Sequence, residues 1–155
     1  MITTNITQLP SGSDFRTLFK HYTVDSGFFL TVDDRAGIER LLRHRGTKNA
    51  PNTSLLNGLL RHKLRISRGA LEPASPELVM SGCHVTYMIS GEGSRSGVLS
   101  MSPAPIPGHV LVASLLGATL IGMRKRQKSP LLRDDGQIDT VVVLDVGPPL
   151  NHDAA

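Results

Sequence analysis

The chain has 155 residues, of which 39% are hydrophobic and only 4% aromatic, and it contains no Trp. This length suits one ordinary domain, or a small domain with an appendage, built around Leu, Val, Ile and Met. Lys and Arg outnumber Asp and Glu by 17 to 13, which suits an acidic protein partner or nucleic acid but requires neither. Cys83 is the single cysteine, so an internal disulfide is excluded and a reducing cytoplasm is favoured.

Neither secretion nor membrane insertion is expected. The first residues lack the basic and apolar regions of a signal peptide. The most apolar run, 110–123, is interrupted by glycines and is shorter than the roughly 20 residues of a membrane span. We therefore expect a cytoplasmic protein with no membrane segment.

The first predicted element is a short amphipathic helix within an N-terminal extension over residues 1–27. Large apolar residues follow Asp14 at helical spacing, namely Phe15, Leu18, Phe19 and Tyr22. Two interpretations stay open at this point. The helix packs on its own domain, or it serves as an arm that docks a partner or a second copy.

Residues 28–68 predict an antiparallel helical hairpin, two helices joined by a short polar turn. The first helix begins with a capping box, Thr31-Val-Asp-Asp34, in which the Thr oxygen accepts from the third amide and the acid reaches back. The second begins at Asn52 or Thr53 and carries a broad stripe of leucines. Lys63 interrupts that stripe, and its ammonium is expected to extend outward into solvent.

A Pro-containing linker over 69–76 precedes a sheet region over 77–149, which makes the predicted fold class α+β. Residues 83–89 alternate at period two and predict a strand that buries Val85, Tyr87 and Ile89. A second strand is predicted over 97–101. A closing strand is predicted over 138–146, with the chain frayed from Gly147 onward.

The most informative motif is a strand that passes through Ser114 into one short helix. Val110, Leu111 and Val112 predict a buried strand, and Ser114 is a good N-cap for the helix that follows. Gly122 can close the other end of that helix in a left-handed conformation.

This unit is similar to the pattern G-K-I-S-V-x-[AS]-P-[VI]-x-x-A-L-[IL]-G of the C-terminal domain of Gre-type transcription factors. Most of the chain, from about residue 29 to 149, resembles their relative, the regulator of nucleoside diphosphate kinase. The resemblance implies an FKBP-like antiparallel sheet domain with one short helix. The sequence departs from the family at Leu111, Leu115 and Arg126, where the family has Ser, Pro and Gly.

The resemblance implies a non-catalytic transcription regulator that binds bacterial RNA polymerase near its secondary channel, with Ser114 as the partner-binding residue. The alternative is a structural or adaptor module of the same fold that has lost polymerase binding. Gre factors cleave transcripts with carboxylates at the hairpin tip, which help to hold a metal ion. Residues 45–52 contain no Asp or Glu, so we expect no cleavage activity.

Other chemistry is not indicated by the sequence. Cys83 and His84 are neighbours in a predicted strand and would point to opposite faces, so they cannot pair as thiolate and imidazole. The six histidines lack metal-ligand spacing, and Asp134-Asp135-Gly136 predicts a turn. We expect no cofactor and no metal. The basic residues allow non-specific contact with nucleic acid as well as a purely solvated surface.

Overall fold

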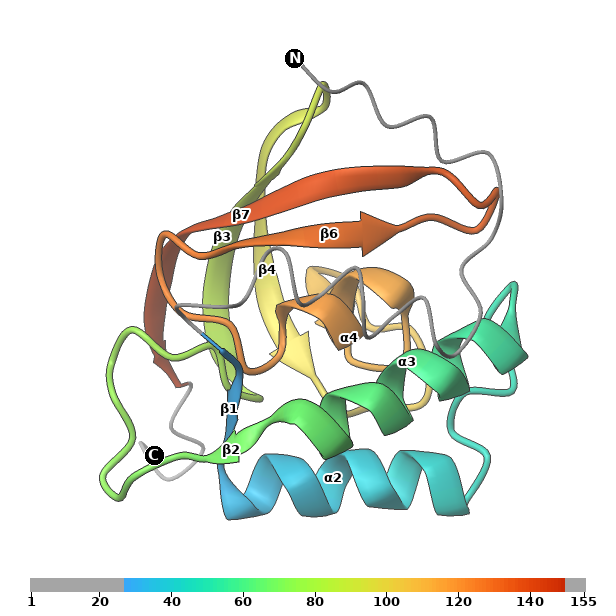
Figure 1. The fold of residues 1–155 in the computed structure, drawn as a ribbon, viewed down its shortest axis with the longest axis horizontal. Helices are drawn as coiled ribbons and strands as arrows, with labels where there is room; N and C mark the ends of the chain where they lie inside the picture. The colour runs from blue at the N-terminus through green and yellow to red at the C-terminus, as the bar shows by residue number, and fades with distance from the viewer. Residues whose placement is uncertain (1–26, 150–155) are drawn as a thin grey trace.

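The computed structural model describes residues 27–149, and these residues form an α+β fold, as predicted (Figure 1). The predicted helix around Phe15 lies outside the described residues. The helices are α2 (Val32–Arg43), α3 (Thr53–Ile66) and α4 (Leu115–Leu120). The strands are β1 (Phe29–Leu30), β2 (Arg68–Gly69), β3 (Cys83–Ile89), β4 (Gly93–Ser100), β5 (His109–Leu111), β6 (Lys128–Leu132) and β7 (Ile138–Pro149).

Five of these strands form one curled sheet in the order β5-β4-β3-β7-β6, and α4 lies between this sheet and α3 (Figure 1). The expectation of a purely antiparallel sheet is wrong at one position, because β4 and β5 are parallel. The connection 101–108 contains three prolines, which stiffen it. It carries the chain back beside Val98, so that β5 begins next to the end of β4 and runs in the same direction. A second, two-stranded parallel sheet joins β1 to β2.

Two strand boundaries differ from the sequence-based expectations. The closing strand does not fray at Gly147, since β7 continues to Pro149 beside Cys83. The sequence interpretation missed β6, because Pro130 argues against a strand. Proline is tolerated there because β6 is an edge strand, where a missing N–H breaks no pairing with an outer neighbour.

Side-chain caps begin α2 and α3 at the positions that the sequence indicates. The Thr31 hydroxyl accepts from the amide of Asp34 at 3.0 Å, and Asn52 accepts from the amide of Leu55 at 3.1 Å. The second half of the predicted capping box does not form. The Asp34 carboxylate instead accepts from the Ser81 amide, at 3.2 and 3.3 Å from its two oxygens, and so links α2 to the loop before β3.

The expectation that Lys63 extends into solvent is wrong. Its side chain is fully buried, and its Nζ donates to the carbonyls of Thr119 and Ile121, each at 2.9 Å. The Nζ also lies 3.5 Å from the centre of the Phe28 ring. Because the last carbonyls of a helix lack partners within the helix, Lys63 satisfies the end of α4 and fixes α4 against α3.

The apolar residues of the helices and of the sheet form one core. Leu56 and Leu59 of α3 belong to the same buried cluster as Val85 of β3 and Val143 of β7. The alternation predicted for β3 is confirmed, because Val85, Tyr87 and Ile89 are buried there. No helix within residues 27–149 is long and apolar enough to cross a membrane.

Candidate functional site

Ser114 lies where the chain leaves β5 and enters α4. Its hydroxyl donates to the carbonyl of Leu111 at 2.7 Å and accepts from the amide of Gly117 at 3.1 Å. The predicted N-cap is therefore confirmed, and the hydroxyl is used within the turn. A partner that contacts this site meets the shape of the turn rather than a free hydroxyl.

Two glycines allow this turn to be tight. A Cβ on Gly117 would lie 1.8 Å from the carbonyl oxygen of Leu111, so no side chain fits there. Gly122 follows α4 with φ +83°, as expected for a helix-closing glycine. Its amide donates to Val79 and its carbonyl accepts from Phe29, each at 3.0 Å. The α4 helix is thus fixed at both ends to other elements.

A groove of about 210 Å³ lies beside Ser114, between the β5–α4 turn and the connection of α2 to α3. From the β5–α4 side it is lined by Leu111, Ala113 and Leu115. From the opposite sides it is lined by residues 49–52 and by Pro103 and Pro105. The site is therefore composite, since segments from the helical part and from the sheet part of the chain form its walls.

The α2–α3 connection that borders this groove is well hydrogen-bonded and basic. The buried Thr47 donates from its hydroxyl to the side-chain carbonyl of Asn57, and the Thr53 hydroxyl lies 3.3 Å from the Thr47 carbonyl oxygen. Arg45 and Lys48 are exposed on this connection. Ordered backbone next to exposed cations makes this rim a defined, positively charged surface.

Reactive side chains do not gather at the groove. Cys83 is buried and His84 is exposed on opposite faces of β3, as expected, and burial raises the pKa of the Cys83 thiol. The described residues contain no group of three or more His, Cys, Asp or Glu placed to hold a metal ion. Asp134, Asp135 and Gly136 form the predicted turn, and Asp134 reaches the groove rim.

The structure brings some of the motif residues together and separates another. Leu111 and Leu115 flank Ser114 in the groove, whereas Arg126 does not line it and has φ +74° in the turn before β6. Sequence reasoning missed the contribution of Ala50, Pro51 and the Pro103–Pro105 segment. The cluster of prolines is the signal that could have indicated an ordered wall.

The fold is similar to that of one solved transcription elongation factor. A GreA/GreB factor from Nitrosomonas europaea matches with a TM-score of 0.54 and 16% identity, over 78% of this chain and 99% of that chain. Gfh1 of Thermus thermophilus matches with a TM-score of 0.39 and 19% identity, over 78% of this chain and 99% of its own. No protein-family model and no curated protein matches the sequence. The likeness to the Nitrosomonas factor is a likeness of fold.

Proposed function

We propose that this chain is a non-catalytic, transcription-associated factor that binds bacterial RNA polymerase near its secondary channel, through the groove beside Ser114. The observation that carries the proposal is the β5–Ser114–α4 unit, placed in a fold that resembles a transcription elongation factor. Kinship with the regulator of nucleoside diphosphate kinase, the antiparallel helical hairpin and the FKBP-like sheet domain belong to the same proposal.

The charge at the end of the two helices supports a role without cleavage. A second catalytic metal ion needs oxygen ligands, preferably carboxylates. The α2–α3 connection offers Arg45 and Lys48 instead, and it contains no Asp or Glu. Asp33 and Asp34 lie at the opposite end of α2, roughly 15 Å away at the helical rise per residue.

The test is binding of purified core RNA polymerase to the immobilised full-length protein at low salt. In Leu115→Glu a charge enters the groove, while the acid sits in the first turn of α4, where the helix dipole favours it. The matched control is Leu144→Glu on β7, which changes a partly exposed leucine that does not line the groove. We expect at least tenfold weaker binding for Leu115→Glu and unchanged binding for the control.

Two results would contradict the proposal. The first is no binding by the unsubstituted protein, which leaves the alternative, an adaptor module of the same fold. The second is equal binding by Leu115→Glu and Leu144→Glu, which moves the contact away from the groove. Circular dichroism of both variants shows whether the fold is intact.

A second candidate function is sequence-independent contact with nucleic acid. Between residues 32 and 69 basic side chains far outnumber acidic ones. The exposed basic residues of this range form no ion pair with another described residue. They are Arg40, Arg43, Arg45, Lys48, Arg61, Arg65 and Arg68. Cations that neutralise phosphates give an affinity that falls steeply with salt. Fluorescence anisotropy with a labelled single-stranded oligonucleotide at 50 and 200 mM NaCl tests this candidate, and a salt-independent signal contradicts it.

A further inference from the structure

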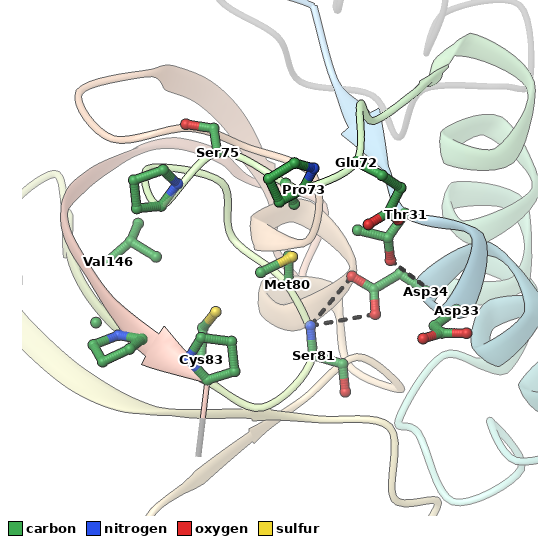
Figure 2. A pocket seen from close by; sticks show the side chains of 15 residues that line it. Thr31, Asp33, Asp34, Glu72, Pro73, Ser75, Met80, Ser81, Cys83 and Val146 are labelled. Atoms are coloured by element: carbon green, nitrogen blue, oxygen red, sulfur yellow. Dashed lines mark hydrogen bonds between the residues drawn. The ribbon is translucent and has the colours of Figure 1, made fainter. Parts of the chain in front are cut away.

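A larger cleft lies at the other end of α2, away from the Ser114 groove. It has a volume of about 560 Å³, and the start of α2, the 72–76 loop, the loop before β3 and the end of β7 line it. Its floor is apolar, with Met80, Cys83 and Val146. Figure 2 shows these residues around the cleft, with Asp33, Asp34 and Glu72 gathered on one side of it.

None of the three carboxylates, Asp33, Asp34 and Glu72, forms an ion pair with a residue that the structure describes. Asp34 is only 4% exposed and accepts from the Ser81 amide. Burial raises the pKa of this carboxyl to about 6, and the neighbouring charge of Asp33 adds to the shift. This side of the cleft therefore carries uncompensated negative charge on a protein whose net charge is +4.

Two exposed apolar residues are sequence neighbours of residues that line the same cleft. Val32 is 78% exposed and lies between Thr31 and Asp33, both of which line the cleft. Leu71 is 86% exposed and directly precedes Glu72. The parallel pairing of β1 with β2 brings the two chain segments to the same edge. These are the two most exposed large hydrophobic residues of the described chain.

From these observations we infer that the cleft is a docking site for a partner protein segment that alternates basic and apolar residues. Arg or Lys side chains of the segment pair with the exposed carboxylates of Asp33 and Glu72, and its apolar side chains contact Met80 and Val146 of the floor. Charge complementarity decides the kind of partner, because the same carboxylates repel the phosphates of nucleic acid. A bare polyamine would leave the apolar floor of the cleft uncovered. The inference does not rest on polymerase binding, since the Ser114 groove lies at the opposite end of α2.

The experiment is an NMR titration of the ¹⁵N-labelled full-length protein with a capped hexapeptide of alternating Arg and Leu. We expect saturable shifts at the amides of Thr31, Ser81 and Val146, with amides around Ser114 unaffected. The double variant Asp33→Asn with Glu72→Gln is expected to bind at least fivefold more weakly. The matched control, Glu39→Gln, removes an exposed α2 carboxylate that does not line the cleft, and is expected to bind within twofold of the parent.

A second peptide of alternating Arg and Ser tests the apolar half of the inference. We expect it to bind at least threefold more weakly than the Leu peptide. Equal binding of the two peptides would overturn the commitment to a basic and apolar segment. No saturable shift at the cleft amides, or equal binding by the double variant, would overturn the site itself. Neither result bears on polymerase binding at Ser114, which the separate experiment on the groove decides.

Discussion

Replacement of Lys63 by Met tests the buried lysine as the link between α3 and α4. The change removes two hydrogen bonds and leaves the carbonyls of Thr119 and Ile121 buried without a donor. An unpaired buried carbonyl costs about 1–3 kcal/mol, so the loss of a donor to both carbonyls costs about 2–6 kcal/mol at a pH where the amine is neutral in both the folded and the unfolded chain. Methionine has a similar length and fills the same space, which limits any contribution from a cavity.

The size of this effect depends on pH, because burial lowers the pKa of Lys63 well below 10.5. Between that lowered pKa and about 10.5, the unfolded chain binds a proton that the folded chain does not. The free energy of unfolding of the parent protein therefore rises with pH in this window, by up to about 1.4 kcal/mol per pH unit, and Lys63→Met lacks this rise.

The assay is urea unfolding at pH 7, 8 and 9, followed by circular dichroism at 222 nm, for the parent, Lys63→Met and the control Lys48→Met. Lys48 is exposed on the α2–α3 connection, so its removal is expected to change the free energy of unfolding by less than about 0.5 kcal/mol at every pH. We expect the difference between the parent and Lys63→Met to grow with pH. A difference that stays flat from pH 7 to 9 would refute the assignment of Lys63 as a buried group with a lowered pKa.

Three further predictions concern single residues. Asp34→Asn should gain stability relative to the parent by about 2 kcal/mol between pH 4 and pH 6. In this range the folded parent, with a pKa of about 6 at Asp34, holds a proton that the unfolded chain has lost, so the parent becomes less stable as the pH rises and the uncharged Asn does not; urea unfolding at both pH values measures this, and a constant difference contradicts it. Gly117→Ala should lower the free energy of unfolding by more than about 3 kcal/mol, because its Cβ meets the Leu111 backbone, whereas Gly69→Ala meets nothing; equal melting temperatures would disprove this. Ser114→Ala should cost about 1 kcal/mol and Ser114→Thr less, because the Thr hydroxyl can both accept from the Gly117 amide and donate to the Leu111 carbonyl; equal losses in thermal unfolding would argue against the cap.

The features that the sequence predicts correctly depend on neighbours along the chain. The caps at Thr31, Asn52 and Ser114 each use an amide three residues later, so the local pattern contains both partners. The alternation of β3 likewise reflects one strand with one buried face. These signals are sufficient to indicate the order of elements and the α+β class.

The errors concern residues whose partners are far away in the sequence. The carbonyls that accept from Lys63 are 56 and 58 positions away, and an apolar stripe does not reveal that these buried acceptors need a donor. Asp34 has the expected place in a capping box, yet its carboxylate accepts from the amide of Ser81, which is 47 positions away. The groove walls at Ala50 and Pro103 depend in the same way on how the helices meet the sheet.

The same distant contacts predict that the helices and the sheet unfold together, although the sequence predicts a helical hairpin over 28–68 and a sheet region over 77–149 with a linker between them. Asp34 of α2 and Lys63 of α3 each bond to backbone beyond residue 77, and the Phe29 amide bonds to Gly122. Opening the helices alone would break these hydrogen bonds, and each buried polar group left unpaired costs about 1–3 kcal/mol of free energy. Native-state hydrogen exchange should therefore give the most protected amides of α3 and of β3 the same opening free energy. Exchange of all α3 amides at least tenfold faster than those of β3 would show that the helices open independently, and that these contacts do not join the two parts.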